Sequence, residues 1–244
     1  MRVTRVFSEE PLASGAEVPL DAAAASHVVR VLRFKPGDSL TLFDGLGGEY
    51  AATVATIRRG AVRVHVGAHD PVEREAPLGI VLAQGVSRGE RMDWVVQKAT
   101  ELGVRSIVPV LTERSVVKLD ARQASAKRAH WRAIAVAACE QCGRNRVPAL
   151  APPVALGEWL GTLRDSHTRL LLDPGAQRPV GVAPTATELT LLIGPEGGLS
   201  DAERQAARGA GFDARRLGPR ILRTETAAIA ALVILQAAAG DLAQ

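Results

Sequence analysis

Two glycine-bearing loops, each leading into a predicted helix, carry the residues with the clearest chemical potential in this sequence. The first, Gly194-Pro-Glu-Gly-Gly198, follows the apolar run Leu191–Ile193, and the second, Leu217-Gly-Pro-Arg-Ile-Leu222, leads into Arg223-Thr-Glu-Thr-Ala227. Glycines let the backbone approach a ligand closely, and peptide N–H groups at a helix start can bind an anionic or polar group. Because the loops lie close together in the sequence, we expect them to form one pocket, which we interpret as a cofactor site.

Two further motifs allow other chemistries. Gly85-Val-Ser-Arg-Gly89 matches the Gly-x-Ser-x-Gly turn of hydrolases, which also requires a histidine in a loop further along the chain. Only His130, within a long predicted helix, and His167, before a strand, follow it, so hydrolysis is a minor alternative. Cys139 and Cys142 lie near a helix end, where a thiolate is disfavoured, and no second pair completes a zinc site. We interpret them as half-buried thiols and expect no metal.

Composition limits the class of protein. The net charge of +4 favours a polyanionic partner, and with only 3% aromatic residues, arginine contacts with phosphate are favoured over base stacking. The segment Met1–Phe7 lacks the apolar core of a signal peptide, and the apolar run Ala227–Ala239 is too short to span a bilayer. We therefore expect a cytoplasmic protein that does not bind a membrane.

The first part of the chain predicts short strands separated by turns. Pro36-Gly37-Asp38 and Asp44–Gly48 are turn sequences, and Asp21 is a candidate helix cap. The expected elements are strands over 2–7, 39–43, 50–57 and 61–66 and a helix over 21–32. Several short strands with little helix predict a small β-barrel.

The polar segment His69–Pro77 predicts a linker, and we divide the chain into domains 1–72 and 73–244. Beyond it, strands and helices alternate, with Gly103 and Gly143 as helix ends. The expected strands are 78–83, 106–111, 169–172, 189–193 and 215–217, and the expected helices are 91–102, 120–142, 201–210 and 224–239. Such alternation predicts a mostly parallel sheet covered by helices, with ligands at the carboxyl ends of its strands.

Six motifs along the chain carry a resemblance to a known family. They are His27-Val-Val-Arg-Val-Leu-Arg33, Lys98-Ala-Thr-Glu-Leu-Gly-Val104, Thr112-Glu-Arg-Ser115, Glu140-Gln-Cys-Gly-Arg144, Ile193-Gly-Pro-Glu-Gly-Gly198 and Leu222-Arg-Thr-Glu-Thr-Ala227. In this order they resemble the ribosomal RNA small subunit methyltransferase E family, of the SPOUT class. The chain departs from that pattern at Leu199, where phenylalanine is frequent, and at Cys142, where serine is frequent.

The resemblance implies a PUA-like β-barrel followed by an α/β methyltransferase domain with a C-terminal trefoil knot. It implies a homodimer that uses S-adenosylmethionine to methylate N3 of a uridine in 16S ribosomal RNA. We expect the RNA within the assembled small subunit to be the substrate, with free RNA as the alternative. It also implies three cofactor loops, carried over onto Leu171, Leu172, Asp173, Gly194, Pro195, Glu196, Gly197, Gly198, Leu217, Gly218, Ile221, Leu222, Arg223 and Thr226. A side chain at Gly197 is expected to enter the pocket.

Candidate catalytic residues follow from their place beside the second loop. As a hypothesis, Arg223 stabilises negative charge on the uracil carbonyls, and Glu225 accepts or positions the N3 proton. Glu196 and Thr224 have alternative roles as helix caps.

Basic and polar residues near the motifs are predicted to contact RNA, although for several of them a solvated helix face is an alternative. They are His27, Arg30, Arg33, Arg88, Arg91, Lys98, Arg114, Ser115, Gln141 and Arg144. Two other functions stay open: a SPOUT methyltransferase for another RNA such as transfer RNA, and a ribosome-assembly factor that binds RNA without catalysis.

Overall fold

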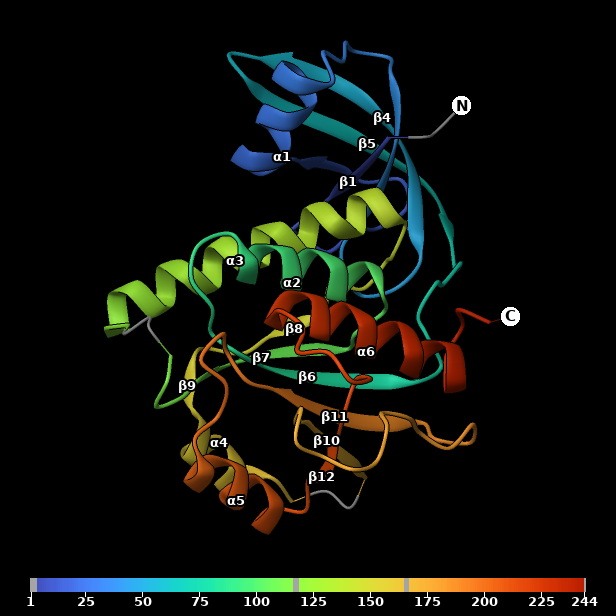
Figure 1. Cartoon of the computed structure of the whole chain (residues 1–244). Helices are drawn as coiled ribbons and strands as arrows, with labels where there is room; N and C mark the ends of the chain where they lie inside the picture. Colours follow the sequence, from blue (N-terminus) through green and yellow to red (C-terminus); the bar gives the residue numbers. More distant parts are fainter. Residues whose placement is uncertain (1–3, 116–118, 165–166, 244) are drawn as a thin grey trace. The chain divides into compact units, whose positions relative to one another are not determined.

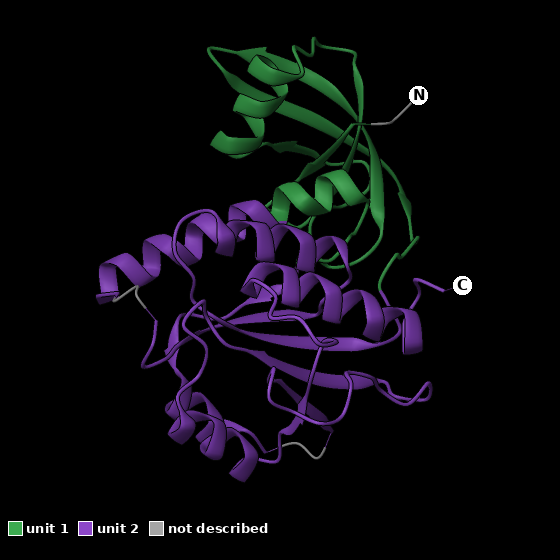
Figure 2. Cartoon of the chain, in the orientation of Figure 1, with its two compact units in different colours: residues 1–75, 136–147 green, residues 76–135, 148–244 purple. Residues whose placement is uncertain are grey.

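The computed structural model of the protein describes residues 4–115, 119–164 and 167–243. The chain forms two compact units, which are distinguished in Figure 2. Unit 1 comprises Met1–Glu75 and Val136–Val147, and unit 2 comprises Ala76–Ala135 and Pro148–Gln244. Unit 1 therefore also takes the end of a helix that is distant in sequence.

Unit 1 is built on a five-stranded sheet with the order β1-β3-β4-β5-β2. Its strands are β1 (Arg5–Phe7), β2 (Glu17–Pro19), β3 (Ser39–Phe43), β4 (Glu49–Arg58) and β5 (Ala61–Asp70). Alternate residues of β5, Val62, Val64 and Val66, are buried, because successive side chains of a strand point to opposite faces. The expected strands are confirmed from Arg5 onward, whereas residues 2 and 3 lie outside the described residues. Strand β2 was not predicted.

The expected helix of unit 1 is confirmed, but its second half is wound differently. Asp21 caps α1 (Ala22–Ser26), and its Oδ1 accepts hydrogen bonds from Ala23 N at 2.8 Å and from Ala24 N at 3.0 Å. The next residues form the π-helical turn η1 (His27–Val31). Apolar residues spaced three and four positions apart predict a helix but do not distinguish α from π winding.

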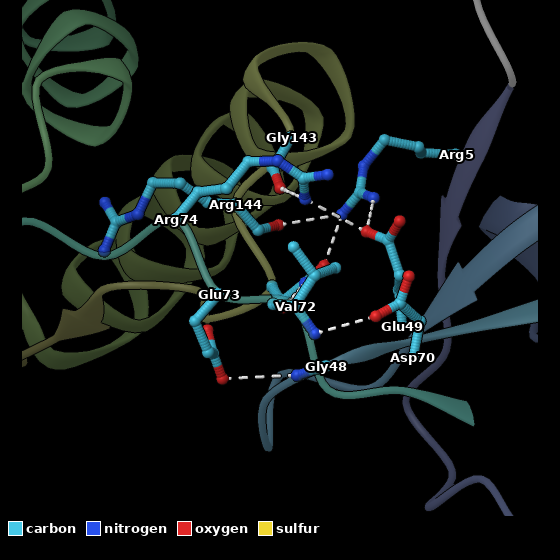
Figure 3. Close-up of polar contacts among 10 residues, drawn as sticks. Arg5, Gly48, Glu49, Asp70, Val72, Glu73, Arg74, Gly143 and Arg144 are labelled. Atoms are coloured by element: carbon cyan, nitrogen blue, oxygen red, sulfur yellow. Dashed lines mark hydrogen bonds and ion pairs between the residues drawn. The ribbon is translucent and has the colours of Figure 1, made fainter.

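Charged hydrogen bonds join the two chain segments of unit 1 (Figure 3). Arg5 pairs with Glu49 and donates from Nη2 to Asn145 Oδ1 at 2.6 Å, and Arg74 Nη1 donates to Gly143 O at 2.9 Å. Arg144, whose side chain is 4% exposed, donates from Nε and Nη2 to the two carboxylate oxygens of Glu75 at 3.0 and 2.5 Å. This buried pair orients the end of the long helix within unit 1.

Replacing Glu75 by glutamine is expected to lower the free energy of unfolding by about 2–4 kcal/mol, because the buried Arg144 guanidinium loses its carboxylate. Urea unfolding measures the change. The matched control is Glu188→Gln, which removes an exposed partner of Arg105 and should cost less than about 1 kcal/mol. Equal losses in the two variants would contradict a stabilising role for the buried pair.

Unit 2 is an α/β structure around a seven-stranded parallel sheet, as expected. The order is β12-β10-β11-β6-β7-β8, with β9 also paired to β7. The strands are β6 (Gly79–Gly85), β7 (Ser106–Leu111), β8 (Ala149–Leu150), β9 (Val154–Ala155), β10 (Thr168–Leu172), β11 (Glu188–Ile193) and β12 (Asp213–Arg215). The middle strands are buried on both faces, which explains the continuous apolar runs in their sequences.

Helices cover both faces of this sheet. They are α2 (Arg91–Glu101), α3 (Ala121–Cys142, whose end belongs to unit 1), α4 (Leu156–Thr162), α5 (Asp201–Gly209) and α6 (Thr224–Ala239). Trp159 of α4 and Ala207 of α5 pack with Leu171 and Leu192 of the sheet. Figure 1 shows α2 and α6 side by side on the opposite face. No helix within the described residues is long and apolar enough to cross a bilayer.

Most predicted elements of unit 2 are confirmed, including the helix end at Gly103, where φ is 78°; the predicted end of the long helix at Gly143, which lies in unit 1, is confirmed too, with φ at 93°. The strand predicted over 215–217 is wrong by two residues: β12 ends at Arg215, where its register with β10 ends, and Leu217 belongs to the following loop. The strands β8 and β9 were not predicted, because two-residue strands carry no periodicity, and the short helix α4 was not predicted either.

Candidate active site

A pocket lies where three parallel strands end. Strands β12, β10 and β11 are neighbours and run in the same direction, so the segments after Arg215, Leu172 and Ile193 meet at one edge of the sheet. The pocket has a volume of about 710 Å³ and is lined mainly by these three segments and by the start of α6. The structure therefore brings the two glycine loops together, as the sequence predicts, and adds the segment after β10.

Most residues carried over as cofactor contacts line this pocket. They are Leu172, Asp173, Gly194, Pro195, Glu196, Gly198, Leu217, Gly218, Ile221, Leu222 and Arg223. Leu171 is instead fully buried beneath α4 and α5, because it is the neighbour of Leu172 and points to the opposite face of β10. Thr226 is exposed on the first turn of α6 and is not among the lining residues.

Gly197 contacts a neighbouring segment rather than the pocket. A Cβ atom at this position would lie 3.0 Å from Cβ and 3.1 Å from O of Arg114. Arg114 also donates from Nη1 to Gly197 O at 3.3 Å. A side chain at 197 would therefore press on Arg114, and the expectation that it enters the pocket is wrong.

A buried chain of hydrogen bonds from β6 through the start of α6 holds the Gly194–Gly198 loop in place. Thr224 Oγ1 donates to Gly194 O at 2.7 Å and accepts from Gln84 Nε2 at 2.9 Å. Arg223 is the N-cap residue of α6, and Thr224 is the first helical residue. The Thr224 hydroxyl therefore holds the Gly194 loop and does not cap the helix. Sequence reasoning did not single out Gln84, although a glutamine ending the apolar run of β6 was an available indication.

Glu196 does not cap the helix that follows it. Ser200 and Glu203 form the capping box of α5, whereas Glu196 accepts from Arg88 N at 3.0 Å and from Arg91 Nη1 at 2.6 Å, at the start of α2. Partial burial alone raises the pKa of Glu196, but hydrogen bonds from backbone N–H groups and from Arg91 outweigh it and hold this pKa below its usual value. Glu196 is therefore a carboxylate at neutral pH.

Glu225 lies in the first turn of α6 and lines the pocket. Its Oε1 is 3.9 Å from Arg91 Nε, while its Oε2 is buried and has no hydrogen-bond partner among the described residues. A buried carboxylate oxygen without a donor is costly. A ligand N–H or O–H in the pocket would satisfy it.

Arginines line the pocket beside the carboxylates of Asp173, Glu196 and Glu225. Arg91, Arg204, Arg215, Arg220 and Arg223 line it. Arg204 and Arg215 pair with Asp201 and Asp213 respectively. Arg220 and Arg223 are exposed and have no ion-pair partner in the described part of the chain. Their guanidinium groups are therefore available to an anionic ligand.

The residues predicted to contact RNA are dispersed between the two units. In unit 2, Arg91 lines the pocket, Arg88 and Arg114 are exposed, and Lys98 pairs with Glu101 at 2.9 Å. Ser115 is buried and its hydroxyl accepts from Thr112 N at 3.1 Å, within a turn.

In unit 1, Arg30, Arg33 and Gln141 are exposed and His27 is half-buried. Arg144 is buried against Glu75, so its guanidinium is not presented to phosphate in this structure. The sequence motif includes Arg144, but it does not show whether this arginine binds RNA or stabilises the fold. That distinction depends on burial, which only the tertiary structure shows.

The alternative chemistries find no support in the geometry. Ser87 Oγ donates to Gly85 O at 3.3 Å, whereas His130 contacts Asp93 and His167 contacts Thr190. Neither histidine activates the serine as a hydrolase requires. Burial raises the pKa of Cys139 to about 12, so it is a neutral thiol. No group of three or more potential metal ligands occurs among the residues that the structure places.

Comparison with known proteins agrees with this architecture. The model of the RNA methyltransferase domain family matches residues 74–236, and the model of the RNA methyltransferase PUA domain matches residues 20–66. The two matches define an RNA methyltransferase with an N-terminal PUA domain.

Individual relatives narrow the class. Ribosomal RNA small subunit methyltransferase E of Buchnera aphidicola is 32% identical over 99% of this chain and 98% of its own, and that of Bacillus subtilis is 33% identical over 84% of each. The chain belongs to the ribosomal RNA small subunit methyltransferase E family.

Solved structures agree with this assignment. A Legionella pneumophila putative methyltransferase in complex with S-adenosylmethionine superposes with a TM-score of 0.94, at 42% identity over 99% of this chain and 100% of that one. The Neisseria gonorrhoeae ribosomal RNA small subunit methyltransferase E bound to S-adenosyl methionine superposes with a TM-score of 0.90. It is 36% identical over 98% of this chain and 99% of its own.

Proposed function

We propose that this protein transfers the methyl group of S-adenosylmethionine to N3 of a uridine in 16S ribosomal RNA. The observation that carries the proposal is the pocket at the ends of β10, β11 and β12, in which Glu225 Oε2 is buried without a donor. Two structures similar to this chain were solved with S-adenosylmethionine, which supports the choice of cofactor.

The residues of the pocket fit this cofactor. A volume of about 710 Å³ lies within the range of small-molecule sites, and Leu172, Ile193 and Leu217 supply apolar surface. Gly198 and Gly218, at φ 68° and 63°, leave the backbone open to close approach. We assign adenosine binding to the backbone of the two glycine loops and to the segment starting at Asp173. When bound, S-adenosylmethionine supplies an electrophilic methyl group on a sulfonium.

The chain's own residues handle the acceptor. Uridine N3 gives up its proton and forms the N–CH₃ bond as the S–CH₃ bond breaks and S-adenosylhomocysteine leaves, and we assign Glu225 Oε2 to accept the N3 proton. As the proton leaves, negative charge develops on N3 and on the uracil carbonyl oxygens, until N3 takes the methyl group and the ring is neutral again. The exposed guanidinium of Arg223, which lines the same pocket as Glu225, donates hydrogen bonds to these oxygens without losing its own proton. The pocket also has to align the methyl donor with N3 and to exclude water.

A labelled-methyl transfer assay tests the proposal against its alternatives. Small ribosomal subunits, free 16S ribosomal RNA and transfer RNA are each offered with labelled S-adenosylmethionine, and the modified nucleoside is mapped. We expect N3-methyluridine in subunit RNA. Label in transfer RNA would overturn the target, and cofactor binding without label in any RNA would favour a non-catalytic assembly factor.

Assembly and location belong to the same proposal. We infer a homodimer, because Val233 and Ile234 on α6 are 41% and 40% exposed and an apolar surface of this kind favours helix packing between subunits. Light scattering of the purified protein measures its mass. A substrate within the assembled subunit, a cytoplasmic location, a domain boundary at residue 72 and a C-terminal trefoil knot remain predictions.

RNA affinity is expected to fall steeply as salt rises. If exposed arginines such as Arg30, Arg88 and Arg114 contact phosphates, each contact releases a counterion, so three contacts predict a slope of log K against log salt of about −2 to −3. Fluorescence anisotropy with a labelled RNA fragment from 50 to 300 mM salt measures the slope. A flat response would count against extended backbone contacts.

A further inference from the structure

Arg91 lies between two carboxylates of the pocket. It is the first residue of α2, and its Nη1 is 2.6 Å from Oε1 of Glu196. Its Nε is 3.9 Å from Oε1 of Glu225. Glu196 belongs to the loop after β11, and Glu225 belongs to the first turn of α6. One guanidinium therefore connects two sides of the pocket with the start of α2.

We propose that Arg91 is a positioning residue that orients Glu225 toward the methyl acceptor and keeps the Gly194–Gly198 loop in its cofactor-binding position. The first part rests on the proposed function, because it requires the acceptor chemistry assigned to Glu225. The second part concerns cofactor binding and can be tested without methyl transfer.

The arrangement explains why an arginine suits this position. The planar guanidinium presents donors in a fixed fork, so one side chain can serve two carboxylates at once, whereas an ammonium group is a point charge. Without Arg91, the carboxyl groups of Glu196 and Glu225 would line one pocket with no guanidinium between them. Arg91 lies toward Oε1 of Glu225, which leaves the buried Oε2 for a ligand donor.

The exposure of Arg91 indicates that this residue positions its partners and contributes little to stability. The Arg91 side chain is 42% exposed, so its ion pairs are screened by water and add little to the free energy of unfolding. The Glu225 side chain is only 17% exposed, and the position of its carboxylate is therefore sensitive to its neighbours. We expect substitutions of Arg91 to change binding and turnover while the melting temperature changes little.

The first experiment measures cofactor affinity by calorimetry with S-adenosylhomocysteine. Arg91→Ala should raise its Kd by about fivefold to tenfold, and Arg91→Lys should stay within about threefold of the unsubstituted protein, because one charge contact with Glu196 remains. In a Glu196→Gln background, Arg91→Ala should change Kd by less than about twofold, since the partner of Arg91 is already altered.

The second experiment measures kcat for methyl transfer with the same variants. Arg91→Ala should lower kcat by about tenfold or more in the unsubstituted protein and by less than about twofold in a Glu225→Gln background. The matched control is Arg105→Ala, which removes an exposed arginine paired with Glu188 at 2.8 Å outside the pocket lining. It should leave both Kd and kcat within about twofold.

The outcomes are distinct. The proposal would be overturned if Arg91→Ala changed Kd by the same factor with and without Glu196→Gln, or changed kcat by the same factor with and without Glu225→Gln. It would also be overturned if Arg91→Ala changed Kd and kcat no more than Arg105→Ala does. If the unsubstituted protein binds S-adenosylhomocysteine but methylates no RNA, the proposed function fails. The affinity cycle with Glu196→Gln then decides alone whether Arg91 positions the loop.

Discussion

Glu225→Gln is expected to lower kcat for RNA methylation by about 100-fold or more, the range for loss of a positioned proton acceptor. Glutamine keeps the size of the side chain but cannot take the N3 proton, and its amide puts a hydrogen-bond donor in place of one carboxylate oxygen. Initial rates with saturating S-adenosylmethionine and small ribosomal subunits measure kcat. Affinity for S-adenosylhomocysteine should change by less than about threefold, because the assigned role concerns the acceptor.

The control for this prediction is Glu188→Gln, which removes an exposed carboxylate from the other end of β11 and should leave kcat unchanged. Arg223→Ala should also lower kcat, since it removes a donor to the uracil oxygens. Near-normal turnover in both Glu225→Gln and Arg223→Ala would show that the chemistry does not depend on the start of α6.

Gly85→Ala is expected to weaken cofactor binding by about tenfold or more, equivalent to at least about 1.4 kcal/mol. A Cβ at this position would lie 2.3 Å from Pro195 N and 2.7 Å from Gly194 C, which are backbone atoms of the cofactor loop. Backbone cannot move aside as a flexible side chain can, so the loop must shift away from β6. Calorimetry with S-adenosylhomocysteine measures the loss.

Gly79→Ala provides the matched control on the same strand. Its Cβ would meet its nearest atoms at 3.5 Å, which is an ordinary van der Waals distance, and it lies at the opposite end of β6 from the pocket. Affinity should therefore remain within about twofold. If Gly85→Ala bound S-adenosylhomocysteine as tightly as Gly79→Ala, the loop of Gly194 would not be required in its present position.

Local chemistry alone was enough to predict much of this protein. The apolar runs of β6 and β11, the cap at Asp21 and the helix ends at Gly103 and Gly143 follow from residue preferences that act over a few positions. The two glycine loops were also visible, because each follows a strand and leads toward a helix. The alternation of strand and helix then placed both loops at the carboxyl edge of a parallel sheet.

The tertiary structure decided which side chains meet. In a parallel sheet, strands pair through long crossover connections, so β10 lies between β11 and β12 although no local pattern specifies that order. This order places Arg91 beside Glu196 and Glu225, from three separate elements, and links Gln84 to Gly194 through Thr224.

The same reason explains the corrected residues. Arg144 is buried by Glu75, which is 69 positions away, and Gly197 faces Arg114 rather than the pocket. Residue type indicates what a side chain can do, while its partners and its burial depend on contacts between segments that are remote in sequence.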